Sequence, residues 1–261
     1  MKNYQHPHLS GSEKRLLSRF GNSTFLESLL AFKKWRPFYL SSFKRSVRTF
    51  TEQHAHFSFK GHIDLPPDFV YRPEMAAPRG REVNGQYFST GYDMNIQDLP
   101  EEIRRLTFSF RGIVENYFAA EANACNAQLW RNIHVPPAIA QANEEVFADA
   151  FHQDLVIDQY NLQLFILLQD TTAQDGPFEY LDGAVQRNEM DYYRKRDRKV
   201  PLSTSQKLVG KRGDYLLFTT GLTLHKAGVP DENHQRDIMS IAFFPTYTNI
   251  GKPLSALQPA P

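Results

Sequence analysis

The sequence contains a single cysteine, Cys125, among its 261 residues. An intrachain disulfide is therefore impossible, and a zinc site built from several thiolates is excluded. Long apolar runs are also missing, because no stretch approaches the roughly 18 apolar residues that predict a membrane-spanning helix. The first residues, MKNYQHPHLSGSEKRLL, lack the apolar segment of a secretory signal. These absences predict a protein of the reducing cytoplasm with no membrane span.

An excess of charge of one sign is absent as well. The 30 Lys and Arg residues nearly balance the 29 Asp and Glu residues, which leaves a formal net charge of +1. This balance gives no reason to expect nucleic acid as a partner. Hydrophobic residues, in contrast, make up 41% of the chain and aromatic residues 13%. That content is enough for a packed core and argues against extensive disorder.

Residues 1–50 interleave lysines and arginines with aromatic side chains. This pattern suits binding to an anionic surface, or to an anionic or amphipathic substrate. It equally suits a helix whose aromatic side chains pack on the core while its lysines stay in water. We favour the helix, because the positive charge is not sustained elsewhere in the chain.

Residues 51–97 are rich in turn-forming residues and predict irregular structure with short strands. His54, His56 and His62 lie in this segment, and the first two would share one face of a strand. No carboxylate stands at a suitable spacing from them. We therefore expect surface or core histidines here, in preference to a metal site.

A helix is predicted from Asp98 to about Ala127. Asp98 is a candidate N-cap, and apolar residues recur after it at helical spacing. These apolar residues are Ile103, Leu106, Phe110, Val114, Tyr117 and Phe118. We expect this helix to support a sheet.

Short strands are predicted in the rest of the chain. The run LQLFILLQD (162–170) is almost continuously apolar, which is typical of a strand buried on both faces. The segment KLVGKRGDYLLF (207–218) predicts two short strands, and RDIMSIAFFP (236–245) predicts another that ends at its proline. Several short strands at close spacing favour a mainly β fold, a barrel or jelly roll, over an α/β fold.

The predicted organisation is one domain, because all-β barrels with helical extensions often reach this length. Residues 1–127 form its helical and irregular N-terminal part, which we expect to shape the substrate side. Residues 128–250 form the β core, and residues 251–261 form a tail.

Three residues in the β core have the pattern of a metal site. His152 and Asp154 stand two apart in FHQD, so in a strand their side chains point to the same face. His225 lies downstream in LTLHKAG, on a strand that a jelly roll can bring beside them. Two imidazoles and one carboxylate make a three-ligand face that leaves half of an octahedral metal open, as in non-haem Fe(II) oxygenases.

Arg236 follows His225 by eleven residues. The connection between them contains Gly228, Pro230 and Asn233, which predicts a turn between two paired antiparallel strands. Arg236 is then expected to face the same interior, where a guanidinium can hold the far carboxylate of an organic acid that chelates the metal. Each part of this pattern is common by chance, but the order, strand context and spacing agree. Together they predict an iron enzyme that uses 2-oxoglutarate and O2.

Residues 128–245, a little under half of the chain, resemble the phytanoyl-CoA dioxygenase family, which includes ectoine hydroxylase and related bacterial hydroxylases. The matching segments are QLWRN (128–132), FHQD (151–154), LLQDTTAQDGPFEYLDG (167–183), GDYLLFTTGLTLHKAG (213–228) and Arg236. The resemblance implies a double-stranded β-helix core, of the jelly-roll and cupin-like kind, supported by the N-terminal helices. It also implies Fe(II) as the metal, 2-oxoglutarate as cosubstrate and O2.

Within this resemblance, His152, Asp154 and His225 match the iron ligands. Arg236 matches the residue that pairs with the distal carboxylate of 2-oxoglutarate. The mechanism implied needs no acid or base from the protein beyond these residues.

The resemblance also covers two amide side chains, and the chain departs from the family pattern at two places. Asn132 matches a position that often contacts the cosubstrate, and Gln128 one that often faces the pocket, although either amide could simply satisfy buried backbone groups. Where the family commonly has P-G-S-H, this chain has Asp-Gly-Ala-Val at 182–185, and Phe151 stands where Trp is frequent. The first departure puts in question any role of that corner in binding substrate.

The reaction implied is hydroxylation of an unactivated C–H bond of a small molecule, coupled to decarboxylation of 2-oxoglutarate to succinate and CO2. Asp154 separates the chain from related halogenases, in which a small residue replaces the carboxylate. Desaturation and ring closure are alternative outcomes. Two other functions stay open: a cupin-like metal enzyme that does not use 2-oxoglutarate, and a non-catalytic protein that binds iron or a metabolite. The residues specify neither the substrate nor the oligomeric state.

Overall fold

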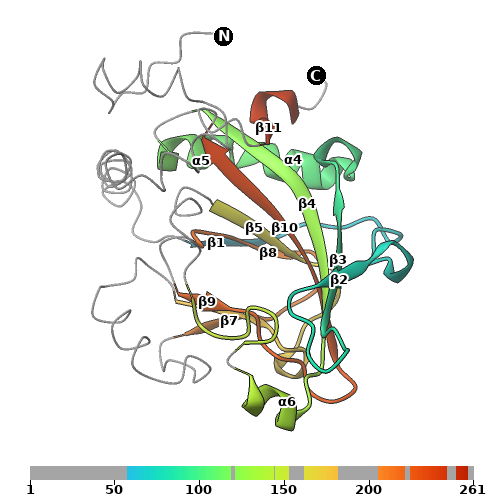
Figure 1. Cartoon of the computed structure of the whole chain (residues 1–261). Coiled ribbons are helices and arrows are strands. Elements are labelled where there is room, and N and C mark those ends of the chain that lie inside the picture. Colours follow the sequence, from blue (N-terminus) through green and yellow to red (C-terminus); the bar gives the residue numbers. More distant parts are fainter. Residues whose placement is uncertain are drawn as a thin grey trace, which may run out of the picture.

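The computed structural model describes residues 58–118, 121–143, 145–152, 162–181, 205–220, 224–245 and 251–257. Within these ranges the chain is mainly β and forms two antiparallel sheets (Figure 1). In the view of Figure 1 the smaller sheet lies below the larger one. No helix in the described ranges has the length and apolar character that crossing a membrane requires.

The strands of the larger sheet are β1 (Ser58–His62), β2 (Ala77–Arg79), β3 (Ser89–Met94), β4 (Ala122–Ile133), β5 (Leu162–Leu167), β8 (Asp214–Phe218), β10 (Gln235–Pro245) and β11 (Lys252–Pro253). The strands of the smaller sheet are β6 (Phe178–Tyr180), β7 (Gln206–Leu208) and β9 (His225–Lys226). The helices are α4 (Glu101–Ser109), α5 (Arg111–Phe118) and α6 (Pro137–Ala142), with 3-10 turns η1 (Pro73–Met75), η2 (Ile96–Asp98), η4 (Ala173–Asp175) and η6 (Leu254–Leu257).

The strand order of the larger sheet is β1-β8-β5-β10-β4-β3-β2, and β11 pairs with β4. The order of the smaller sheet is β7-β6-β9. Strands that are distant in sequence are therefore neighbours in space, as β1 and β8 show through the pairing of Ser58 with Phe218. The N-terminal strands β1 to β3 belong to the same sheet as β5 and β10.

Strand β5 is apolar on both faces because both faces are covered. Leu164 and Ile166 pack in the core that includes the helices, whereas Phe165 and Leu167 pack in the core that includes β6 and β7. Alternate residues of a strand point to opposite faces, so each layer receives every second side chain. The predicted strand with two buried faces is confirmed.

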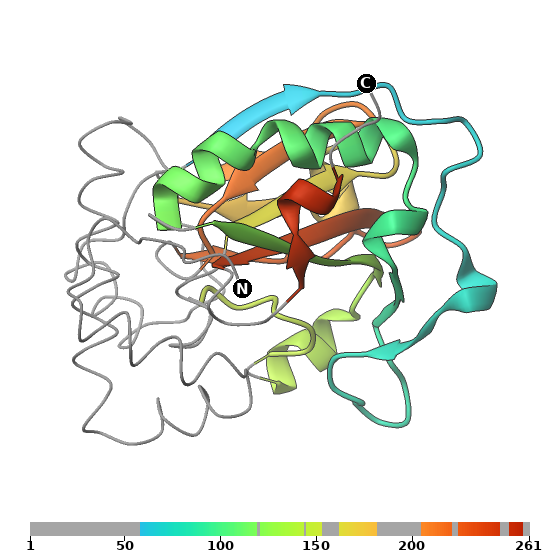
Figure 2. The ribbon, with the colours of Figure 1, turned by 90° about the horizontal axis from the view of Figure 1, so that it is seen from above.

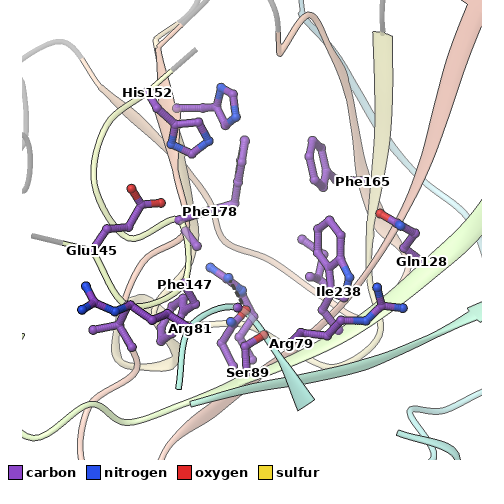
Figure 3. Close-up of a pocket in the computed structure, with 18 of the residues that line it drawn as sticks. Arg79, Arg81, Ser89, Gln128, Glu145, Phe147, His152, Phe165, Phe178 and Ile238 are labelled. Carbon is purple, nitrogen blue, oxygen red and sulfur yellow. Dashed lines mark hydrogen bonds between the residues drawn. The ribbon is translucent and has the colours of Figure 1, made fainter. Parts of the chain in front are cut away.

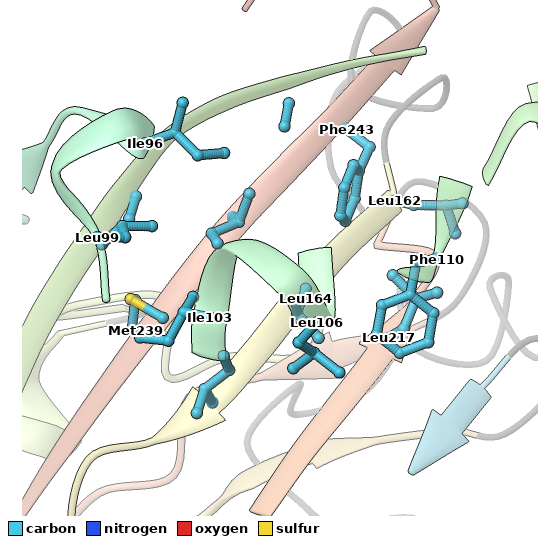
Figure 4. Close-up of a cluster of buried hydrophobic side chains, with 14 of the residues drawn as sticks. Ile96, Leu99, Ile103, Leu106, Phe110, Leu162, Leu164, Leu217, Met239 and Phe243 are labelled. Atoms are coloured by element: carbon cyan, nitrogen blue, oxygen red, sulfur yellow. The ribbon is translucent and has the colours of Figure 1, made fainter. Parts of the chain in front are cut away.

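Helices α4 and α5 cover the face of the larger sheet that lies away from the smaller sheet (Figure 2). Ile103 and Leu106 of α4 meet Leu164 of β5 and Met239 of β10 in one buried cluster (Figure 4). Burial of each such side chain contributes about 1.5–3 kcal/mol. The predicted apolar positions and the support of a sheet by helix are confirmed.

The predicted extent of this helix is wrong in two respects. Asp98 ends η2 instead of capping α4, whose N-cap is Pro100. The helical segment ends at Phe118, and β4 begins at Ala122. The segment that starts at Ala122 has modest strand propensity, but it pairs with both β10 and β3, and this tertiary pairing overrides the local preference.

The predicted pairing of the strands that carry His225 and Arg236 is also wrong. His225 lies on β9 in the smaller sheet, and Arg236 lies on β10 in the larger one. The connection between them is held by other loops, because Ala227 N–H donates to the Ala148 carbonyl and Asp231 N–H to the Gln174 carbonyl. Because β9 and β10 belong to different sheets, this connection crosses from one sheet to the other, as does the connection between β7 and β8.

Candidate functional site

A cavity of about 680 Å³ is lined by residues of both sheets (Figure 3). Strands β4, β5 and β10 contribute alternate residues on the face opposite the helices, which are Gln128, Trp130, Asn132, Gln163, Phe165, Arg236 and Ile238. The smaller sheet contributes Phe178 and His225, and the loop before β5 contributes His152. The volume is in the range of pockets that hold small-molecule ligands.

His152 and His225 form an antiparallel bridge at the edge of the smaller sheet. Each backbone N–H donates to the carbonyl of the other residue over 3.0 Å. The two ring centroids are 4.4 Å apart, and both rings line the cavity. The backbone thus places two imidazoles side by side.

The ring of His152 has a defined orientation. Its Nδ1 lies 2.8 Å from the carbonyl oxygen of Ala150. A carbonyl only accepts hydrogen bonds, so Nδ1 donates to it, and in the neutral ring the lone pair is on Nε2. A histidine whose other ring nitrogen donates to a carbonyl in this way is oriented as metal-binding histidines usually are.

The ring of His225 is buried among aromatic side chains. Its centroid lies 5.6 Å from that of Phe178 and 5.8 Å from that of Phe218, and the residue is 5% exposed. These rings restrict the imidazole and keep water from one side of it. Asp154, the third predicted ligand, lies outside the described residues, and within the described part of the chain no three His, Cys, Asp or Glu side chains gather as a metal-binding group.

Arg236 is a buried cation without a counter-ion in the described residues. It is 2% exposed, and its guanidinium donates to the Gly176 carbonyl and, over 2.6 Å, to the Asn132 side-chain oxygen. Its Nε has no hydrogen-bond partner. Burial lowers the pKa of Arg236 to about 10. Because a buried charge is stable only when it is paired, this guanidinium favours an anionic ligand.

The Gly176 carbonyl is held in place by a turn between the sheets. Thr172 and Asp175 form a capping box on η4, and Asp175 Oδ1 lies 2.9 Å from His234 Nδ1. Gly176 follows with φ of 62°, where a Cβ would lie 2.4 Å from the Pro230 nitrogen. Glycine is required here both for the left-handed backbone and for this close approach.

Five of the six predicted site residues line this cavity. They are Gln128, Asn132, His152, His225 and Arg236, and the sixth, Asp154, is not described. Asn132 contacts Arg236 directly, because the two stand opposite each other on β4 and β10. Sequence reasoning missed Arg79, Arg81 and Glu145, which lie outside the segments that resemble the family. The only available signal was the pair of arginines on either side of Gly80.

No protein-family model matches the chain, and no curated protein matches it in sequence. Several solved structures have a similar arrangement. The non-haem 2-oxoglutarate-dependent carbocyclase SnoK from nogalamycin biosynthesis is 14% identical, with a TM-score of 0.49 over 77% of this chain and 83% of its own. HygX from Streptomyces hygroscopicus, with nickel, 2-oxoglutarate and hygromycin B bound, is 12% identical, with a TM-score of 0.46 over 76% and 87%. EctD from S. alaskensis, with bound Fe, is 10% identical, with a TM-score of 0.45 over 80% and 79%.

Identities and TM-scores this low do not assign a function, since one fold can host many activities. The function proposed below therefore rests on the residues of this chain.

Proposed function

We propose that this chain is a non-haem Fe(II) dioxygenase with a double-stranded β-helix core, related to the phytanoyl-CoA dioxygenase family. It uses 2-oxoglutarate and O2 to hydroxylate an unactivated C–H bond of a small molecule. One observation carries the proposal: among the described residues the buried guanidinium of Arg236 has no carboxylate partner, and it lines the same cavity as the paired imidazoles of His152 and His225. A dicarboxylate that reaches both would supply the missing counter-charge.

The residues fit such a metal and cosubstrate. His152 through Nε2, His225 and Asp154 would hold the metal, in keeping with two imidazoles and one carboxylate for non-haem iron. The unpartnered Nε and buried position of Arg236 suit a carboxylate, which accepts bidentate hydrogen bonds from a guanidinium. When bound, iron and 2-oxoglutarate supply the oxidising chemistry, with succinate and CO2 as the products of the cosubstrate.

The other cavity residues orient the guanidinium of Arg236 and shield the cavity from water. Asn132 and the Gly176 carbonyl accept from Arg236 and so fix the plane of its guanidinium. Phe165, Phe178 and Ile238 line the cavity with apolar surface, which excludes water and strengthens charge interactions inside it. The site thus binds one anion rigidly and leaves the remaining volume to a substrate.

Calorimetry under anaerobic conditions tests the proposal. We expect the Fe(II)-loaded protein to bind 2-oxoglutarate, and Arg236→Lys to bind it at least about tenfold more weakly, because a lysine cannot form the bidentate pair. Arg111→Lys is the matched control, since this half-buried helical arginine pairs with Glu115 and is not among the described residues that line the cavity. Absence of binding, or equal binding by the Arg236→Lys variant, contradicts the use of 2-oxoglutarate.

A second measurement tests catalysis. In air, the loaded enzyme should convert 2-oxoglutarate to succinate, and His152→Ala should abolish this conversion. Incubation with a panel of small molecules, followed by mass spectrometry, should find a product heavier by one oxygen atom. Binding of 2-oxoglutarate with no succinate formed on any panel would favour the non-catalytic alternative.

A further inference from the structure

The cavity carries more positive charge than the cosubstrate needs. Its described lining includes three guanidinium groups, those of Arg79, Arg81 and Arg236, and a single carboxylate, that of Glu145. In the proposed function Arg236 binds 2-oxoglutarate. Two arginines and Glu145 therefore remain, a net excess of one positive charge for whatever else enters the cavity.

Gly80 places these two arginines. It follows β2 with φ of 75°, a left-handed conformation that favours glycine. A Cβ at Gly80 would lie 3.2 Å from the Val146 carbonyl oxygen, and the Arg81 N–H donates to that same oxygen over 3.3 Å. The chain thus bends tightly around the 146–147 segment, and the residues on both sides of the bend, Arg79 and Arg81, line the cavity.

The two arginines differ in how far they are neutralised. Arg79 makes one 3.1 Å contact with Asp93, and both side chains are partly exposed. Arg81 has no ion pair among the described residues; its hydrogen bond to Val146 comes from the backbone. Of these two arginines, Arg81 is therefore the one whose guanidinium is available to a ligand.

The two arginines and the aromatic side chains line opposite ends of the cavity. Figure 3 shows Arg79 and Arg81 at the end of the cavity away from His152, and Glu145 on the wall between Arg81 and His152. Phe165 and Phe178 lie at the histidine end, where the ring centroid of Phe178 is 5.6 Å from that of His225. A ligand that spans the cavity would meet the arginines at one end and aromatic side chains at the other. Such a lining matches a molecule with an anionic head and an apolar body.

We propose that the substrate is an amphipathic organic acid whose carboxylate binds Arg81 and whose apolar body lies along Phe165 and Phe178. That this acid is the substrate rests on the proposed function, whereas the presence of an acid-binding site does not. A planar guanidinium pairs best with a planar carboxylate, and a cavity of about 680 Å³ shared with 2-oxoglutarate limits the acid to a small molecule.

The test measures binding through Trp130, which lines the cavity and is one of two tryptophans in the chain. Trp35→Phe makes it the sole fluorescent indole. The probes are two matched pairs, 4-phenylbutanoate with 4-phenylbutanol, and decanoate with decanol. Each is titrated into the protein loaded with Mn(II) and saturating 2-oxoglutarate, and separately into the protein alone.

We expect at least one acid to bind roughly tenfold more tightly than its alcohol, the increment of one charge-assisted hydrogen-bonded pair. Arg81→Ala should remove this difference and leave alcohol binding unchanged, whereas Arg81→Lys should retain part of it. Arg79→Ala should have a smaller effect, because Asp93 already partly neutralises Arg79. Arg105→Ala, which removes an exposed arginine of α4, is the control for net charge and should have none.

The proposal is overturned if neither acid binds more tightly than its alcohol, or if Arg81→Ala weakens acid and alcohol equally. Gly80→Ala tests whether the bend positions the arginines. This variant should weaken acid binding although both arginines remain, because alanine disfavours the left-handed backbone at this position. Failure of 2-oxoglutarate binding with retained, Arg81-dependent acid binding would reject the proposed enzyme class and keep the acid site. The reverse result would reject the acid site alone.

Discussion

The backbones of His152 and His225 are joined by two hydrogen bonds of 3.0 Å, in which each residue donates to and accepts from the other. Their rings, 4.4 Å apart, are therefore positioned by the main chain. The Ala150 carbonyl, at 2.8 Å from Nδ1, further fixes the ring of His152. Two of the three proposed metal ligands are thus preformed, and little conformational entropy is lost when they bind an ion.

The first prediction concerns this pair. His152→Ala and His225→Ala should each weaken Co(II) binding at least about 100-fold, because losing a ligand should cost more than losing an outer-shell partner, which costs about 10–100-fold. Visible absorption of Co(II) reports binding directly. His134→Ala is the control, because its ring bonds to the Pro230 carbonyl and does not line the cavity. Wild-type affinity in either of the first two variants would contradict the metal site.

Local sequence patterns predicted much of the fold correctly. The apolar run around Leu164 indicated a strand with two buried faces, and the helical spacing from Ile103 onward indicated the helices that cover the sheet. Both signals are properties of a residue and its near neighbours. The strand predicted over residues 236–245 likewise carries Arg236, whereas Asn132 was predicted through the family resemblance and not from a strand pattern; both side chains line the cavity.

Features set by distant contacts were not predictable in this way. Nothing near His225 indicates that β9 joins β6 in the smaller sheet, because the pairing partner Tyr180 is far away in sequence. The start of β4 at Ala122 depends on its pairing with β10 and β3. Arg81 reaches the cavity only because Gly80 bends the chain against Val146, a contact between segments that no local pattern relates.

The second prediction follows from the buried charge of Arg236. Burial lowers its pKa to about 10, so the group is still charged at neutral pH, and burying this charge without an anion destabilises the folded state. At about 100 times its dissociation constant, 2-oxoglutarate should stabilise the metal-loaded protein by about 2.7 kcal/mol, a rise of several degrees in Tm. Arg236→Met should show no such rise, whereas the control Arg105→Met should behave like the wild type. Differential scanning fluorimetry measures both, and an equal rise in Arg236→Met would exclude this arginine as the anion site.

The third prediction concerns the turn that holds Gly176. Burial raises the pKa of Asp175, but hydrogen bonds from Thr172 and His234 outweigh this effect and hold the pKa below its ordinary value. The carboxylate therefore stabilises the fold fully above about pH 4, and this contribution is lost as the pH falls through the lowered pKa. Asp175→Asn should cost about 1–3 kcal/mol at pH 7 and progressively less below pH 4.

Urea denaturation at several pH values measures this dependence. Asp170→Asn is the matched control, because Asp170 is exposed and bonds to Lys211 on the surface, where such pairs contribute little. Asp175→Asn should also weaken 2-oxoglutarate binding severalfold, since the Gly176 carbonyl that accepts from Arg236 loses its support. A loss of stability that is the same at pH 3 and pH 7 would show that the carboxylate charge is not involved.

The fourth prediction separates stability from ligand binding at Arg236. Asn132 accepts from this guanidinium over 2.6 Å, so Asn132→Asp places a carboxylate beside a cation that has no carboxylate partner among the described residues. The variant should raise the Tm of the ligand-free protein and lower its affinity for 2-oxoglutarate at least about tenfold, because the introduced carboxylate takes the place of the ligand's and repels it. Asn126→Asp makes the same chemical change at an exposed position of β4 and should do neither. The expected result is a higher Tm together with a lower affinity for 2-oxoglutarate. A variant with a lower Tm and a lower affinity would mean that Asn132 holds β4 and β10 together. A variant with full affinity would mean that the distal carboxylate of 2-oxoglutarate binds elsewhere.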